Sequence, residues 1–171
     1  MEGDAMEVED PIRVVYDASY PVLVAQLLAI CGNHLEAEEV VQEAFIAAMT
    51  HRREFLEVAN KEAWLRTTAV NVMRNRWRRA RIFGRIVPRL RQDVAFDVGP
   101  DARADHVAIV AALAQLSAPI RETVVLYYIV DLPIVQVAQE QDIPVGTVKA
   151  RLARARTQLA GLLGEWETDH V

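Results

Sequence analysis

Residues 143–156 have the sequence IPVGTVKARLARAR, a basic run in an otherwise acidic chain. From Val148 onward, apolar residues recur at intervals of four, three, four and three, and so line one side of a helix: Val148, Leu152, Ala155, Leu159 and Leu162. The arginines fall on another face, and no acidic residue lies between Asp142 and Glu165 to neutralise them. This spacing predicts an amphipathic helix that packs on one side and attracts anions on the other.

A shorter helical pattern precedes the basic helix. It covers residues 132–141, has a proline near its first turn, and leads into a tight connection at Asp142 and Ile143. Such a pair is a helix-turn-helix, whose second helix enters the major groove of duplex DNA. Arg151 and Arg154 are candidates for base edges. The full predicted DNA-binding set is Thr147, Lys149, Ala150, Arg151, Arg154 and Arg156.

A second basic surface is expected on a longer helix that begins near Glu62 and extends to Arg81 or beyond. Between Arg66 and Arg91 the chain has nine arginines and no acid. Trp77 lies among them, and aromatic rings beside cations suit unstacked single-stranded bases, although a core position fits this tryptophan equally well. The predicted strand-binding residues are Asn71, Arg74, Trp77, Arg78 and Arg81.

The composition is that of a globular chain with room for two small domains. Of 171 residues, 25% are charged, and the net charge of −5 hides acidic and basic segments. Cys31 is alone, which excludes an intrachain disulfide and favours a buried apolar role. With no signal-peptide pattern and only short apolar runs, we expect a cytoplasmic protein without membrane insertion.

The helical periodicities predict an all-α fold of two small helical domains joined by a flexible linker, the C-terminal one containing the helix-turn-helix. Within the first domain, Pro21 is expected to bend or restart a helix, and residues 50–61 form a polar break. The predicted segments are a disordered acidic leader (1–11), a first domain (12–86), a linker (87–105), a second domain (106–164) and a tail (165–171).

Several motifs in this order strongly resemble the extracytoplasmic-function (ECF) sigma factors of bacterial RNA polymerase. Residues 37–45, AEEVVQEAF, resemble the family's core-polymerase segment. Residues 63–65, AWL, followed by Ala69, Asn71 and the arginine run, resemble the region that melts and recognises the minus-ten element. Residues 146–155 resemble the domain that recognises the minus-thirty-five element. The resemblance extends over about residues 12–164.

The resemblance implies a promoter-specific initiation factor that binds core RNA polymerase and promoter DNA, uses no cofactor, and is held inactive by an anti-sigma factor. Residues 50–61 would form the loop that captures a flipped base. The polymerase would contact one face of the helix at 37–49, through Glu39, Gln42, Glu43 and Ile46.

The chain also departs from the family pattern. Glu140 and Gln141 stand where apolar residues are usual, Asp142 where glycine is common, and Ala150 where serine is frequent. We expect the first two to loosen the packing between the helices of the helix-turn-helix.

Two other functions are compatible with parts of the sequence. A stand-alone LuxR-like regulator would share the basic helix, but would not need residues 37–45 or the arginine-rich helix. An enzyme would need a metal cluster such as His34, Glu36, Glu38, Glu39 and Glu43. The matching carboxylate and histidine ligands from other helices are missing, so catalysis is not expected.

Overall fold

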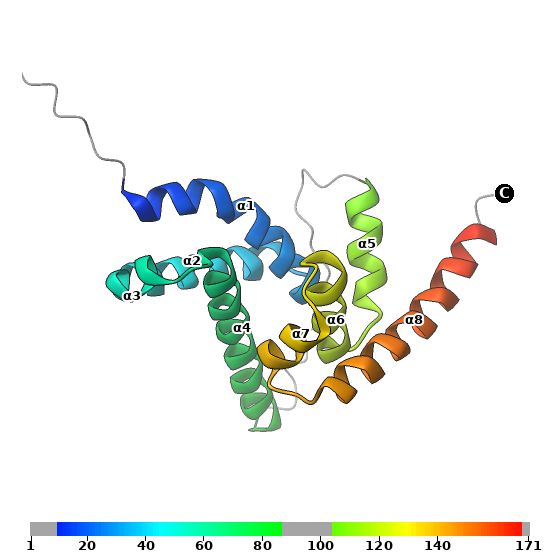
Figure 1. The fold of residues 1–171 in the computed structure, drawn as a ribbon. Coiled ribbons are helices and arrows are strands. Elements are labelled where there is room, and N and C mark those ends of the chain that lie inside the picture. The colour runs from blue at the N-terminus through cyan, green and yellow to red at the C-terminus, as the bar shows by residue number, and fades with distance from the viewer. Residues whose placement is uncertain (1–9, 87–103, 169–171) are drawn as a thin grey trace, which may run out of the picture.

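The computed structural model describes the backbone of residues 10–86 and 104–168, and the side chains of residues 10–80, 82 and 109–161. Every regular element in these ranges is helical (Figure 1), as predicted. The N-terminal part has α1 (Pro11–Cys31), α2 (His34–Thr50), α3 (Arg52–Glu57) and α4 (Lys61–Ile86). The C-terminal part has α5 (Ala104–Ala114), α6 (Ala118–Val124), the π-helix η1 (Val125–Ile129), α7 (Ile134–Gln141) and α8 (Val145–Thr168).

Helix α1 spans the segment in which the sequence predicted a bent or restarted helix. The Asp10 carboxylate accepts a hydrogen bond from the Ile12 N–H at 2.9 Å, and Gly32 ends the helix in the left-handed conformation with φ 75°. Pro21 lies inside the helix, which continues past it as one element rather than restarting. By length and composition alone α1 is the one helix of the described chain that could cross a membrane, but 44% of its apolar window is buried in the fold. The core helix of a folded protein meets the same criterion.

The core of the N-terminal part forms where α1, α2 and α4 meet. Helix α2 begins at Asn33, whose side chain accepts a hydrogen bond from the Glu36 N–H at 2.9 Å. Its apolar side faces inward, and the fully buried side chains around it include Leu27, Val40, Val41, Leu65 and Met73. Cys31 is buried here too, as expected.

The predicted polar break contains a helix. Residues 52–57 form α3, because Phe55 is fully buried and packs edge-to-face on Trp64, with 5.2 Å between the ring centroids. Trp64 is therefore a packing residue. The prediction of a polar break over residues 50–61 was wrong for residues 52–57, which are helical.

The helix-turn-helix is formed by α7 and α8, as predicted. Asp142 adopts the left-handed conformation at the turn (φ 51°), and the Ile143 N–H closes the turn by donating to the Ala138 carbonyl at 3.0 Å. Val148, Leu152 and Ala155 of the predicted stripe are buried against α6 and α7. Helix α8 continues to Thr168, so the predicted tail from residue 165 is largely helical.

The N- and C-terminal parts pack together. One continuous cluster of buried apolar side chains extends from α1, α2 and α4 to η1 and α8, and the C-terminal half of α1 contacts α5, α6 and η1. In Figure 1, α4 lies between α3 on one side and the α6–α8 group on the other. The two predicted helical parts therefore contact each other through a shared apolar cluster.

Candidate nucleic-acid interface

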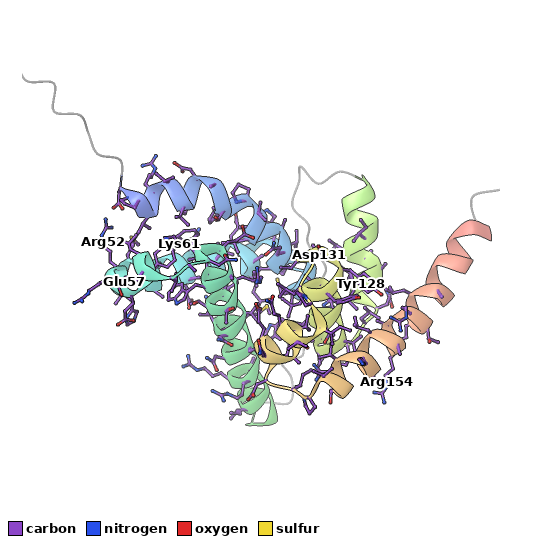
Figure 2. All side chains as sticks on the ribbon, in the orientation of Figure 1. Arg52, Glu57, Lys61, Tyr128, Asp131 and Arg154 are labelled. Atoms are coloured by element: carbon purple, nitrogen blue, oxygen red, sulfur yellow. The ribbon has the colours of Figure 1, made fainter. Side chains whose placement is uncertain are left out.

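The basic helix α8 exposes most of its predicted DNA-binding residues. Lys149, Ala150, Arg154 and Arg156 are exposed, and Arg154 projects outward from α8 in Figure 2. Thr147 and Arg151 are half-buried at the start of the helix. The face that the spacing predicted is therefore open to an anionic partner along the described part of α8.

Arg151 is held by the preceding helix. Its guanidinium Nη1 donates to Gln141 Oε1 at 3.3 Å, and the same oxygen accepts a hydrogen bond from Thr123 Oγ1 at 2.7 Å. Gln141 is buried and joins α6, α7 and α8 at the turn. We expected Gln141 to loosen this packing. In the structure its Oε1 accepts hydrogen bonds from α6 and α8, whereas its buried Nε2 has no hydrogen-bond partner.

The predicted strand-binding residues of α4 divide into two groups. Asn71 and Arg78 are exposed on one face of the helix. Arg74, on the same face, is half-buried and bonded to the C-terminal part: Nε donates to Glu122 Oε2 at 3.2 Å and Nη1 to the Glu140 carbonyl at 3.1 Å. The side chain of Arg81 lies outside the described residues.

Trp77 lies on a different side of α4. Its indole Nε1 donates to Glu36 Oε1 at 2.8 Å, and its half-buried ring packs against the core. Burial raises the pKa of the Glu36 carboxyl, and the Trp77 hydrogen bond opposes that rise. The structure therefore places Trp77 against α2, in agreement with a packing position for this tryptophan in the free protein.

The predicted polymerase face of α2 is exposed and ordered by a single arginine. Glu39, Gln42, Glu43 and Ile46 all lie on the surface. Arg76 of α4 donates from Nη1 to Glu39 Oε2 at 2.7 Å and from Nη2 to Glu43 Oε1. The hydrogen bond to Glu43 is the main cause of a raised pKa for Arg76. The guanidinium fork thus holds two carboxylates side by side on the outer face of α2.

Two exposed apolar residues extend this face and were missed in the sequence. Leu35 and Met49 are 63% and 56% exposed. Together with Glu39, Gln42 and Ile46 they recur every three or four residues, which was the signal that could have revealed them.

The acidic residues of α2 do not form a metal site. Glu36 accepts from Trp77, Glu39 and Glu43 pair with Arg76, and Glu38 lies 3.4 Å from His34 Nδ1. In the residues that the structure describes, no group of three or more His, Cys, Asp or Glu side chains could hold a metal ion.

Comparison with known proteins identifies the family. Residues 15–82 match the family model of Sigma-70 region 2, and residues 106–159 match that of Sigma-70, region 4. The ECF RNA polymerase sigma factor SigL of Mycobacterium tuberculosis is 33% identical over 145 residues, which cover 82% of each chain. The chain belongs to the ECF RNA polymerase sigma factors. The ECF sigma factor SigW of Bacillus subtilis is 29% identical over 171 residues, covering 92% of this chain and 89% of SigW.

Two solved structures have a similar fold. Sigma factor RpoE of Bartonella quintana, in complex with the anti-sigma factor NepR, aligns with a TM-score of 0.70 at 27% identity, over 89% of this chain and 96% of RpoE. CnrH, in complex with the cytosolic domain of CnrY, aligns with a TM-score of 0.58 at 25% identity, over 90% and 88%.

The match to both regions decides between the functions left open by the sequence. A LuxR-like regulator would account for the basic helix alone, whereas the region 2 model matches α1 to α4 as well. This ECF sigma factor is a promoter-recognition factor for transcription initiation that acts with RNA polymerase.

Proposed function

We propose that this sigma factor uses three helix faces for three ligands: α2 for core RNA polymerase, α4 for the minus-ten element and α8 for the minus-thirty-five element. Residues 12–86 and 106–164 are then the two functional regions. The observation that supports the proposal is that surfaces of opposite charge are exposed on separate helices. The exposed face of α2 is acidic and apolar, and those of α4 and α8 are basic.

On α8, Arg151 and Arg154 are proposed to contact base edges. A guanidinium can donate two hydrogen bonds to guanine O6 and N7, and its position near the start of the second helix is where base contacts occur. Thr147 and Ala150 would contact a thymine methyl group. Lys149 and Arg156 would bind phosphates and set the position of the helix on the duplex.

On α4, the proposed strand-binding residues are Asn71, Arg74, Trp77, Arg78 and Arg81. Asn71 and Arg78 are exposed in the present arrangement, and the Arg78 guanidinium donates from Nη2 to Asn75 Oδ1 at 3.0 Å. Arg74 and Trp77 would bind DNA only after leaving Glu122 and Glu36, respectively. Binding by these two residues therefore requires a change in side-chain partners.

On α2, the proposed polymerase contact combines Glu39, Gln42, Glu43 and Ile46 with the adjacent Met49. An apolar centre with polar surroundings is the usual composition of a protein interface. Arg76 binds one oxygen of each carboxylate, and a carboxylate has a second oxygen with which to accept a hydrogen bond from a partner. Arg76 therefore orders the acidic pair while leaving it able to bind a cationic group.

The same proposal includes location and regulation. RpoE and CnrH were solved with NepR and with the cytosolic domain of CnrY. We propose that an anti-sigma factor also binds this chain in the cytoplasm, and that the polymerase alone performs the chemistry.

The test is in vitro transcription from fragmented host genomic DNA, with core polymerase alone and with core plus this protein, followed by sequencing of transcript starts. New starts that share two motifs at fixed spacing are expected. Arg151→Ala should change the preferred upstream motif, and Lys149→Ala provides a control for general loss of charge on the same helix. Absence of binding to core polymerase would refute the proposal.

A further inference from the structure

Arg151 is the arginine of α8 whose guanidinium is held by a buried side chain. Its Nη1 donates to Gln141 Oε1 at 3.3 Å, and Gln141 is only 8% exposed. Arg154, one turn further along the same face, is exposed and has no hydrogen-bond partner among the described residues. An arginine without a partner loses much rotamer freedom when it binds a ligand. Arg151 is therefore already oriented in the free protein, whereas Arg154 has to be ordered by DNA.

The oxygen that holds Arg151 is itself fixed by two helices. Gln141 is the last residue of α7, so its backbone is held in the final turn of that helix. The fully buried Thr123 of α6 places its Oγ1 2.7 Å from Gln141 Oε1 and 2.8 Å from the Pro119 carbonyl. Because this hydroxyl has one proton to share between two acceptors, the Arg151 guanidinium completes the hydrogen bonding of Oε1. Helices α6 and α7 thus set the position of Oε1, and Oε1 sets the direction of Arg151.

Gln141 holds the guanidinium without neutralising its charge. Arg76 of α4 shows the alternative, because it is paired with the carboxylates of Glu39 and Glu43. A carboxylate at position 141 would compete with DNA for the charge of Arg151, whereas a neutral amide does not. A guanidinium has five N–H donors. One bond to Gln141 therefore leaves the two donors that a guanine can engage.

The same glutamine is unfavourable for stability alone. Its Nε2 is buried and has no hydrogen-bond partner among the described residues. A buried donor without an acceptor is destabilising, and an apolar side chain of similar size would avoid that cost. Packing at this turn therefore does not account for an amide at position 141, whereas the bond from its Oε1 to Arg151 does.

We propose that Gln141 is a positioning residue for promoter recognition. It directs the Arg151 guanidinium at one base pair of the upstream element and so sets the selectivity at that base pair. Without the amide, the long side chain of Arg151 would sample neighbouring bases and phosphates as well. The inference rests on the base-edge role proposed above for Arg151, and it concerns a buried residue that does not itself contact DNA.

The test uses holoenzyme assembled from core polymerase and the full chain, with and without Gln141→Leu. A pool of promoter fragments in which each upstream base pair is changed singly is bound in competition, and the bound fraction is sequenced. Arg151→Ala identifies the base pair that depends on Arg151. At that base pair, Gln141→Leu should lower the ratio of preferred to substituted sites about two- to tenfold, the range expected when one long side chain loses its order. Preferences at the other base pairs should not change.

Further variants separate positioning from packing. If Gln141 acts through Arg151, Gln141→Leu has no additional effect on selectivity in an Arg151→Ala background. Gln141→Glu keeps the acceptor and should retain the base preference, while it binds all promoters more weakly because its charge opposes DNA. Gln139→Leu is the matched control, since it replaces an exposed glutamine of the same helix and should leave selectivity unchanged.

Two failures can be told apart in the same experiment. If Arg151→Ala weakens binding equally on every sequence, the base-edge role of Arg151 is refuted and the inference with it. If one base pair depends on Arg151 but not on Gln141, or if Gln141→Leu weakens binding equally on every sequence, the positioning role alone is overturned.

A measurement without DNA tests the geometry directly. Nuclear magnetic relaxation of the Nε–Hε group of Arg151 in the free full-length protein should show less order in Gln141→Leu than in the wild type, with no change for Arg154. Equal order at Arg151 in both proteins would contradict the inference. Circular dichroism establishes that each variant is folded, and Gln141→Met is a second apolar replacement to use if Gln141→Leu is not.

Discussion

Replacement of Glu43 by arginine tests the α2 face most directly. In the folded protein Glu43 pairs with Arg76, which also binds Glu39 at 2.7 Å. The variant loses one exposed ion pair, worth about 0.2–1 kcal/mol, and places two arginines together at a similar cost. We therefore expect the free energy of unfolding to fall by about 0.4–2 kcal/mol. Because globular domains are stable by about 5–15 kcal/mol, the variant should remain folded.

The effect on polymerase binding should be larger. Loss of one member of a charge pair that becomes buried in an interface costs about 2–5 kcal/mol. At 1.4 kcal/mol for each tenfold, the Kd for core polymerase should rise roughly 30-fold to a few thousand-fold. The two effects differ because the Glu43 carboxylate is half-exposed in the free protein, whereas the proposed polymerase contact would cover it.

The assay is a fluorescence titration of labelled protein with core polymerase, with urea denaturation of each variant in parallel. Glu43→Gln is the matched control: it removes the charge without adding repulsion, so its Kd should lie between those of the wild type and Glu43→Arg. A Glu43→Arg Kd within about threefold of wild type would refute the assignment of this face to polymerase, since even a weak buried pair exceeds that limit.

Three further predictions concern other parts of the molecule. Arg151→Ala should lower discrimination at one upstream base pair by about 1–3 kcal/mol in competition binding with point-mutated promoters; equal loss on every sequence would make Arg151 a phosphate contact. Burial raises the pKa of the Cys31 thiol to about 11. At pH 8 the thiolate fraction of Cys31 is then about a hundredfold below that of an exposed cysteine. Iodoacetamide should therefore modify Cys31 in the folded protein at least about a hundredfold more slowly than it modifies free cysteine. Equal rates would contradict the burial of Cys31. Phe55→Ala should reduce the free energy of unfolding by about 3–5 kcal/mol in urea, and Phe55→Leu by less; a loss below about 1 kcal/mol would show that packing on Trp64 does not hold α3.

Local periodicity was sufficient to predict the parts of the fold that depend on neighbouring residues. The buried stripe of α8 and its exposed arginines follow from the helical repeat, and the turn at Asp142 follows from a residue type that tolerates the left-handed conformation. The family motifs are equally local, and the matches to both sigma regions confirm the resemblance.

The features that sequence reasoning missed depend on contacts between distant residues. Helix α3 has six residues and exists because Phe55 meets Trp64, which no periodicity of so short a segment can show. The partner of Arg74 is 48 positions away, and the partner of Trp77 is 41 positions away. Glu140 was expected to weaken the packing of the helix-turn-helix. It pairs instead with Arg66 of α4, a contact that the sequence of α7 alone does not show.

The apolar cluster that continues from α1 into η1 and α8 limits how this protein can be recombined with its relatives. A hybrid made by exchanging residues 104–168 for those of another ECF sigma factor would place foreign side chains against the C-terminal end of α1. The packing between the two parts would then be mismatched, even if the join in the chain lay far from both proposed DNA-binding faces. A hybrid designed to combine two promoter preferences should therefore carry residues 24–31 of α1 from the donor of its C-terminal part, so that the shared surface is inherited as one unit.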